Sequence, residues 1–508
     1  MRTRARIFSS FSSSRNGAFL KRYWYYYYSY RPRIRETTTS VRGDFPRNEM
    51  MMSSSSSTNE TFINDSNVRS MDFRDWLSVE RFLLQIVREE KNLSDVHVAD
   101  AEPDLPWNFS VQKTLEEAKD AKQRSHRTQT ESKRAKYCVR LKYFGNAFAS
   151  FAWDKNVDDT SKHSSERFYG DNWQPGNASV VATIRESLGE HCAGFDKEKH
   201  PVVYQSGRTD RNVSGAGQIV QIFRDAKNHL ERRYVDETEE ERKCELIRRA
   251  INESTEVGKR GYLKAVECFR VNAEWHATFS ATWRRYVYII PKKTLDVDEV
   301  KEELRKVEGG ETDVEDVDAF AHHSKEEIDC DLLDRMLRKF ENKTLDFYAY
   351  ARDTPKGKST ECKMLYARAK TISIPKFQMK AATSKYGKRY RDRRYKDTSL
   401  LYDETAFHRA TRTEKEEEEE EEPLECIAIE LVADRFLRKM VRCIVSTACR
   451  EASSSLSSSK KFNEDALLDL ARNRDRMASA PPAPPHGLLF CGVGYGNKSY
   501  ESFVTDFV

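Results

Sequence analysis

The chain has 508 residues and a formal net charge of +5, and only 38% of its residues are apolar. Globular domains typically reach roughly 45–50%, so the composition excludes one compact fold over the whole length and indicates a folded core with polar insertions and tails. The near-balanced charge permits a nucleic-acid partner without requiring one.

Two further properties narrow the class of protein. No apolar run reaches the roughly 18 residues that a bilayer-spanning helix needs, so we expect a soluble protein without a membrane partner. The 10 cysteines include no C-x-x-C pair, which predicts free thiols in a reducing compartment and no metal site.

The N-terminal region, residues 1–52, is basic and rich in serine and aromatic residues, and its first acidic residue is Glu36. This composition is typical of a transit peptide for a mitochondrion or a plastid. A disordered basic tail on a nuclear or cytoplasmic protein is the alternative. Residues 53–135 read as a linker and extension, which begins with five consecutive serines and contains an amphipathic pattern at 71–92 that predicts one helix.

The predicted folded part begins at residue 136, where polar and apolar residues alternate as in a half-buried strand. Strand and helix patterns then interleave, which favours an α+β fold of two related halves. We assign 136–295 to the N-terminal half and 342–508 to the C-terminal half, with a charged insertion at 296–341 between them. The expected strands are 136–145, 217–223, 279–290, 367–375, 425–433 and 486–495, and the expected helices begin at Ser179 and span 434–452.

A second insertion, residues 376–422, carries strong local charge. Its stretch 380–396 has eight basic residues and one acidic residue with tyrosines between them, and 416–422 is a run of seven glutamates. The basic stretch suits the binding of RNA phosphates, whereas a solvated insertion is the alternative. The candidate RNA contacts in it are Lys385, Lys388 and Arg389.

The most informative stretch is the loop before strand 217–223, which reads SGRTDRNVSGA over residues 206–216. Asp210 lies among small residues that favour tight turns, so the local pattern alone favours a turn residue that hydrogen-bonds its own backbone. The alternative is a carboxylate presented at the mouth of a cleft, two residues after Arg208.

Four sequence blocks, in order, resemble the TruA-type tRNA pseudouridine synthase family. The loop and the start of its strand resemble the pattern G-R-T-D-x-G-V-x-A-x-G-Q, and EWHATFSATWRRYVYII resembles F-H-A-R-F-S-A-x-x-R-x-Y-x-Y-x-I. ADRFLRKMVRCIV resembles N-x-F-x-x-x-M-V-R-x-I-V, and APPAPPHGLLFCGVGY resembles the closing pattern A-P-x-x-G-L-x-L-x-x-V-x-Y. The resemblance covers roughly residues 136–295 and 342–496.

This resemblance implies two α+β halves with antiparallel sheets, forming a pseudouridine synthase fold around a basic RNA-binding cleft. It implies an isomerase that converts uridine to pseudouridine in the anticodon stem-loop of tRNA, at nucleotides 38–40, without a metal or organic cofactor. It also implies a homodimer that binds tRNA across both subunits. A related synthase that modifies another RNA site, and a non-catalytic RNA-binding protein or tRNA chaperone of the same fold, are the alternatives.

The resemblance also implies roles for four residues. Asp210 matches the family's nucleophile, Arg442 matches the arginine that supports it, and Tyr286 matches the tyrosine that packs against the target base. Arg208 matches the arginine that fills the space left by the flipped uridine. The residues themselves leave alternatives open: at 100° per residue Arg442 lies opposite the apolar face of its predicted helix and is expected to face solvent, and Tyr286 suits a core position on a strand.

Several positions depart from the family patterns, although none of them removes a residue with an implied role. Asn212 stands where glycine is usual, and the shape of the loop depends on whether asparagine adopts the same backbone conformation there. The other departures are Gly215 in place of alanine, Phe144 in place of aspartate, and Arg438 and Lys439 in place of a histidine pair.

Overall fold

The computed structural model divides the chain into two compact units, and every element discussed below lies in the unit Arg74–Thr294, Glu326–Met379 and Thr413–Val508. Lys385, Lys388, Arg389 and the glutamate run lie outside the described residues. The structure describes residues 71, 74–96, 98, 136–153, 155–158, 168–169, 173, 175–191, 201–223, 237–271, 275–294, 326–355, 357–376, 423–453 and 463–495.

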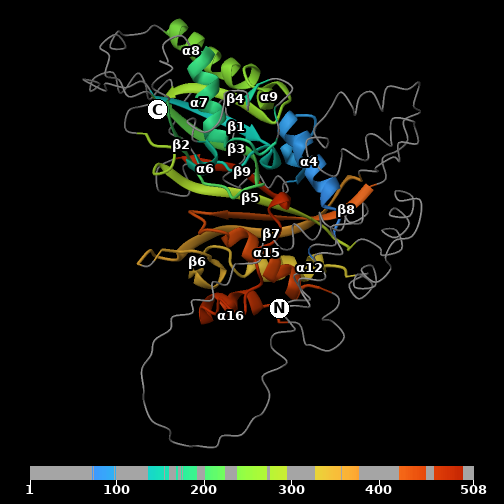
Figure 1. The fold of residues 1–508 in the computed structure, drawn as a ribbon. Helices are drawn as coiled ribbons and strands as arrows, with labels where there is room; N and C mark the ends of the chain where they lie inside the picture. Colours follow the sequence, from blue (N-terminus) through green and yellow to red (C-terminus); the bar gives the residue numbers. More distant parts are fainter. Residues whose placement is uncertain are drawn as a thin grey trace, which may run out of the picture. The chain divides into compact units, whose positions relative to one another are not determined.

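Nine strands form one sheet in the order β4-β1-β3-β9-β5-β8-β7-β6, with β2 paired to β3 beside this path (Figure 1). Among these strands only the pairing of β3 with β9 is parallel. The strands are β1 (Lys136–Tyr143), β2 (Val202–Gln205), β3 (Ser214–Phe223), β4 (Leu263–Val271), β5 (Ala281–Pro291), β6 (Lys343–Asp346), β7 (Glu361–Pro375), β8 (Pro423–Ala433) and β9 (Leu488–Tyr495).

The last strand, β9, belongs to the predicted C-terminal half but lies between two strands of the predicted N-terminal half. It pairs with β3, where Ser214 lies opposite Leu489, and with β5, where Tyr286 lies opposite Phe490. The predicted α+β class is confirmed, and the strands of both halves belong to a single, largely antiparallel sheet. Because β9 lies between β3 and β5, residues from the two ends of the folded part become close neighbours.

Three of the longer helices, α4, α7 and α15, lie within or close to the ranges where their patterns predicted helices. The predicted cap at Ser179 is confirmed, because its Oγ accepts a hydrogen bond of 3.0 Å from the Ala182 amide. Asp158 also accepts a bond of 2.9 Å from the Ser179 amide. The longer helices are α4 (Trp76–Arg88), α7 (Val180–His191), α8 (Glu237–Glu253), α12 (Cys330–Arg338), α15 (Met440–Glu451) and α16 (Ala466–Asn473).

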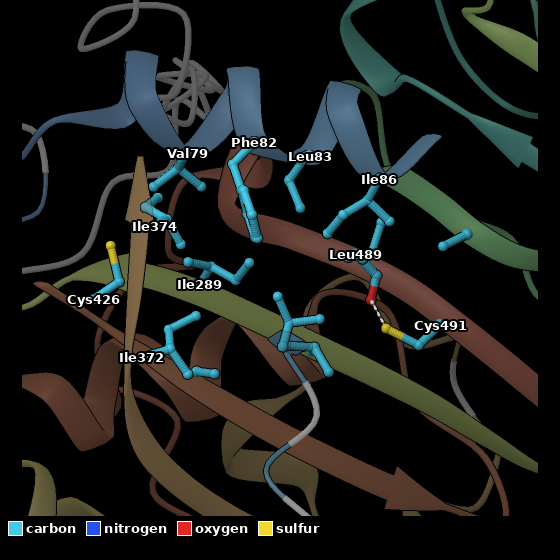
Figure 2. Close-up of a cluster of buried hydrophobic side chains, with 14 of the residues drawn as sticks. Val79, Phe82, Leu83, Ile86, Ile289, Ile372, Ile374, Cys426, Leu489 and Cys491 are labelled. Atoms are coloured by element: carbon cyan, nitrogen blue, oxygen red, sulfur yellow. Dashed lines mark hydrogen bonds between the residues drawn. The ribbon is translucent and has the colours of Figure 1, made fainter. Parts of the chain in front are cut away.

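Helix α4 is the amphipathic helix predicted within 71–92, and it packs on the sheet of its own chain (Figure 2). Asp75 caps its first turn by accepting a bond of 3.1 Å from the Ser78 amide. Burying each large apolar side chain of its inner face stabilises the fold by about 1.5–3 kcal/mol. These side chains are Val79, Phe82, Leu83 and Ile86, and they contact residues of five strands, among them Ala216, Ile289, Ile372, Cys426 and Leu489.

The predicted helix 434–452 begins later than its sequence pattern indicated, at Met440. Lys439 has a positive φ of 61°, which is incompatible with a continuing right-handed helix. Asp434 instead forms two hydrogen bonds with Lys363 of β7. Its amide donates to the Lys363 carbonyl at 3.1 Å, and its Oδ1 accepts from the Lys363 amide at 2.9 Å. This local hydrogen bonding keeps residues 434–439 out of the helix.

Two findings bear on the expected class of the protein. No helix among the described residues is long and apolar enough to cross a membrane. The nine cysteines within the described ranges are all free thiols, and six of them are buried.

Candidate active site

The centre of the candidate site is an ion pair between Asp210 and Arg442. Arg442 Nη1 donates to Asp210 Oδ2 at 2.8 Å. The two side chains differ in exposure, 27% for Asp210 and 4% for Arg442. One oxygen of the carboxylate is therefore held by a buried cation, while the carboxylate as a whole remains partly open to solvent.

Arg442 does not face solvent, as its helical spacing predicted, but is buried in α15 at 3% exposure. Its Nε donates to the Ala483 carbonyl at 2.6 Å, and its own carbonyl accepts from the Ala483 amide at 3.0 Å. The prediction was wrong because the side of α15 opposite its apolar face is covered by the chain before β9. A periodic pattern shows which residues share a face but not what lies against it.

The covering segment, residues 480–485, is rich in proline and lies along α15. Thr447 accepts a bond of 3.0 Å from the Ala480 amide, and Ser446 donates to the Pro481 carbonyl. From β5, the Tyr288 hydroxyl donates to the Pro484 carbonyl at 2.8 Å. Proline restricts φ and offers no amide donor, so this segment presents carbonyls to α15 with little freedom. The Ala483 carbonyl thereby fixes the direction of the Arg442 guanidinium.

Hydrogen bonds from β3 anchor the loop that carries Asp210. Gln218 accepts from the Ser206 hydroxyl at 2.6 Å and donates to the Gly207 carbonyl at 2.7 Å. Tyr143 on β1 forms a hydrogen bond of 2.8 Å with Thr209, the residue directly before Asp210. Burial raises the pKa of Tyr143, so its hydroxyl is neutral at physiological pH. The loop is thus anchored on both sides of Arg208.

Asn212 has a positive φ of 65° and adopts the backbone shape that a glycine would provide. It is the third residue of a four-residue turn closed by a bond of 3.3 Å from the Val213 amide to the Asp210 carbonyl. A turn with positive φ at this position requires glycine or asparagine. The departure from the family pattern therefore preserves the turn.

We expect Asn212→Gly to leave stability and activity close to those of the unchanged protein. Asn212→Val should lower the free energy of unfolding by about 1–2 kcal/mol, because a β-branched residue is strained at this φ. Urea unfolding of the two variants measures the difference. Equal stability of the valine and glycine variants would show that the loop relaxes out of this turn.

Gly215 leaves space for Tyr143. A Cβ at position 215 would lie 2.4 Å from Tyr143 Cε1, closer than non-bonded carbon atoms approach. Opposite the loop, a Cβ at Gly145 would lie 2.5 Å from the backbone of Asn212. Both glycines let the loop lie directly on β1 and the turn that follows it.

Tyr286 lies beside the loop and is buried. Its ring meets Phe490 and Phe436 edge to face, with centroids 4.9 and 5.1 Å away. A Cβ on Gly207 would lie 3.7 Å from the Tyr286 hydroxyl. Burial, with smaller contributions from Tyr143 and from the charge of Asp210, raises the pKa of Tyr286. Tyr286 therefore presents a neutral phenol next to the Asp210 loop.

Arg284 was not singled out by its sequence, yet it connects three segments around the loop. Its Nη1 donates to the Asp434 carbonyl at 2.7 Å, and its Nη2 donates to the Thr278 and Ser206 carbonyls at 2.9 and 3.2 Å. Its place two residues before Tyr286, in a block shared with the family pattern, was the only available signal. A hydrogen bond to a backbone carbonyl cannot be predicted from residue type, because every residue has a backbone carbonyl.

Arg208, the remaining residue with an implied role, is exposed on the loop. The structure therefore brings Asp210, Arg442 and Tyr286 to one place, with Arg208 at its exposed side. The basic residues predicted to contact RNA in the insertion 376–422 lie beyond the described residues, so the structure does not place them.

Comparison with known proteins identifies the proteins to which this chain is similar. The family model described as tRNA pseudouridine synthase matches residues 344–496, which include Arg442. A protein named tRNA pseudouridine synthase A from Chloroflexus aurantiacus is 22% identical over 328 residues, covering 65% of this chain and 84% of that protein. Proteins of the same name from Gloeobacter violaceus and Methanothrix thermoacetophila are 30% and 27% identical over 133 and 144 residues, covering 25% and 27% of this chain and 34% and 43% of theirs.

Several independent observations now agree. The family model and the relatives point to the same activity. The fold is of the mixed α+β class that the resemblance implied. Residues of four separate sequence blocks meet around one ion pair. The chain is an isomerase that is similar to the TruA-type tRNA pseudouridine synthases.

Proposed function

We propose that this enzyme converts uridine to pseudouridine in the anticodon stem-loop of tRNA, with Asp210 as the nucleophile. The observation that carries the proposal is the 2.8 Å contact between the buried Arg442 guanidinium and the partly exposed Asp210 carboxylate. A nucleophilic carboxylate must remain ionised and still reach its substrate. A cation held behind it, on the protein side, meets both requirements.

In this proposal the reaction needs no group from the protein that is consumed, because it rearranges bonds within the substrate. The bond from the sugar C1′ to N1 of the uracil breaks, the base turns, and C1′ bonds to C5; C5 loses its proton and N1 gains one. Atoms and electrons balance within the substrate, so no external oxidant or reductant takes part. In this proposal the Asp210 carboxylate bonds transiently to C1′ as the bond from C1′ to N1 breaks, and the bond to Asp210 breaks again when C1′ bonds to C5.

Tyr286 and Arg208 complete the proposed site. A neutral phenol ring, held edge-on by Phe490 and Phe436, offers a rigid surface for the turned-out base. Arg208 is exposed on the same loop, where its guanidinium can occupy the gap that the base leaves in the RNA. Unstacking a base costs a few kcal/mol, and such an insertion offsets part of that cost.

Three further proposals concern the enzyme in the cell. Lys385, Lys388 and Arg389 would contact tRNA phosphates, two copies of the chain would bind one tRNA, and the basic N-terminal 52 residues would direct import into a mitochondrion or plastid. What supports them is the charge of these segments and the resemblance to the family.

Pseudouridine mapping of total RNA, with and without the protein, tests the substrate. We expect signals at nucleotides 38–40 of organellar tRNAs to disappear when the protein is absent. An isolated anticodon stem-loop with those uridines changed to cytidine should not react. Loss of signals only at other RNA sites would contradict the proposed position, and tRNA binding without any pseudouridine would favour a binding protein.

A further inference from the structure

We propose that Tyr204, His276 and Phe279 form a stacking platform for an unpaired base of the RNA substrate, within about six nucleotides of the base that reacts. The inference rests on tRNA being the substrate and adds a recognition site outside the Asp210 centre. Phe279 is the most exposed of the large apolar side chains in the described part of the chain, at 84%. Tyr204 is also exposed, at 42%.

The three rings lie in a row, with Tyr204 stacked on His276 and Phe279 tilted against the other side of the pair. Tyr204 and His276 are parallel within 28° with centroids 4.9 Å apart, and His276 and Phe279 are 4.4 Å apart with planes 39° from parallel. Phe223 supports the Tyr204 end from the end of β3, with centroids 5.5 Å apart. Aromatic rings arranged in this way offer a face on which a base of any identity can stack.

The platform is rigid although its outer ring is exposed. His276 Nδ1 accepts hydrogen bonds from the amides of Thr278 and Phe279 at 3.1 and 3.4 Å, and the His276 amide donates to Ser280 at 3.0 Å. Burial and the charge of Lys136 lower the pKa of His276, so its ring is neutral at pH 7 and stacks without carrying a charge. A preformed platform loses little side-chain freedom when a base binds.

The platform is connected to the loop of Asp210. The Thr278 hydroxyl donates to the Gln205 carbonyl at 2.6 Å, and Arg284 Nη2 contacts both the Ser206 and the Thr278 carbonyls. Tyr204 lies six residues before Asp210, which limits the distance between their backbones to about 20 Å. One RNA strand in stacked geometry covers that distance in about six nucleotides.

The surrounding charge favours RNA over other occupants. Lys136 acts on His276 from β1, and Arg208 is exposed on the loop that runs from Tyr204 to Asp210. Exposed aromatic rings interleaved with cations suit a single strand, whose bases stack while its phosphates contact the cations. A second copy of the chain would bring the same cations and no phosphates.

The test is a tRNA-binding titration of the full-length protein in an Asp210→Asn background, so that binding is measured without turnover. Phe279→Ala should weaken binding by about 5- to 150-fold, the range found for loss of one base–aromatic contact. The slope of log Kd against log salt should stay unchanged, because stacking releases no counterions.

Three matched variants sharpen the result. Phe279→Trp should bind as well as the parent, and Phe279→Leu, which is apolar but not aromatic, should bind as weakly as Phe279→Ala. Met477→Ala removes another large apolar side chain, which is 80% exposed, and should leave the Kd for tRNA unchanged. The platform is refuted if Phe279→Ala or Phe279→Leu binds tRNA like the parent, or if Phe279→Ala changes only the mass of the oligomer.

The outcome separates this inference from the proposed function. Loss of tRNA binding in Phe279→Ala supports the platform even where the unchanged enzyme makes no pseudouridine at the proposed nucleotides. Normal pseudouridine formation at those nucleotides, together with unchanged binding by Phe279→Ala, supports the function and rejects the platform.

Discussion

Replacing Asp210 should abolish pseudouridine formation while tRNA binding persists. In Asp210→Asn the amide oxygen can still accept from Arg442 Nη1, which now lies 2.8 Å from the carboxylate, so the fold is retained and only the nucleophile is lost. We expect activity to fall by roughly 10⁴-fold or more, the scale on which residues of a nucleophilic unit act. Single-turnover assays on a tRNA transcript, with a parallel binding titration, measure both effects.

The matched control removes a carboxylate elsewhere. Asp331 is exposed in the first turn of α12, and Asp331→Asn should leave the rate within about twofold. Asp210→Ala should be as inactive as Asp210→Asn but less stable, because it leaves the buried guanidinium without its partner. Substantial activity in either Asp210 variant would remove Asp210 from the role of nucleophile.

Arg442→Lys should lower the rate by about 10²–10³-fold although it keeps the positive charge. The guanidinium uses its planar fork to donate to the Ala483 carbonyl through Nε and to Asp210 through Nη1. A lysine has one nitrogen and cannot reproduce both directions. Loss of one fixed electrostatic partner at a reacting group costs an effect of this size. The fall should appear in kcat more than in KM, because Arg442 is buried behind the carboxylate.

Arg450→Lys is the control for this substitution. Arg450 lies on the same helix and pairs with Glu451 at 2.7 Å, away from Asp210. It should retain nearly full activity. If Arg442→Lys also retained nearly full activity, a positive charge alone would suffice. The simultaneous hydrogen bonds of the guanidinium to Ala483 and Asp210 would then have no role in the rate.

The local elements could be predicted well from the sequence because they depend on near neighbours. Alternation predicted β1, helical spacing predicted α4, and Ser179 marked the start of α7. Asn212 could be recognised as unusual, and turn chemistry explains why it is tolerated. Each of these depends on a few consecutive residues.

The surroundings of Arg442 could not be predicted in the same way. Its burial depends on the Ala483 carbonyl and on the Asp210 loop, which are remote in sequence. Helical spacing placed Arg442 on the polar side of α15, and that side is covered by chain rather than by water. The resemblance to the family anticipated the pairing with Asp210, but it carried no information about Ala483 or Arg284.

The position of β9 has a consequence for how the protein is made. β3 and β5 are synthesised long before β9, the strand that lies between them. At about 5–20 residues per second, the ribosome leaves the facing edges of β3 and β5 unpaired for roughly tens of seconds. Open strand edges template aggregation, so the nascent N-terminal half needs protection until residue 495 emerges. A chain that stops before β9 would keep Asp210 and Arg442 yet lack the strand that pairs with both β3 and β5.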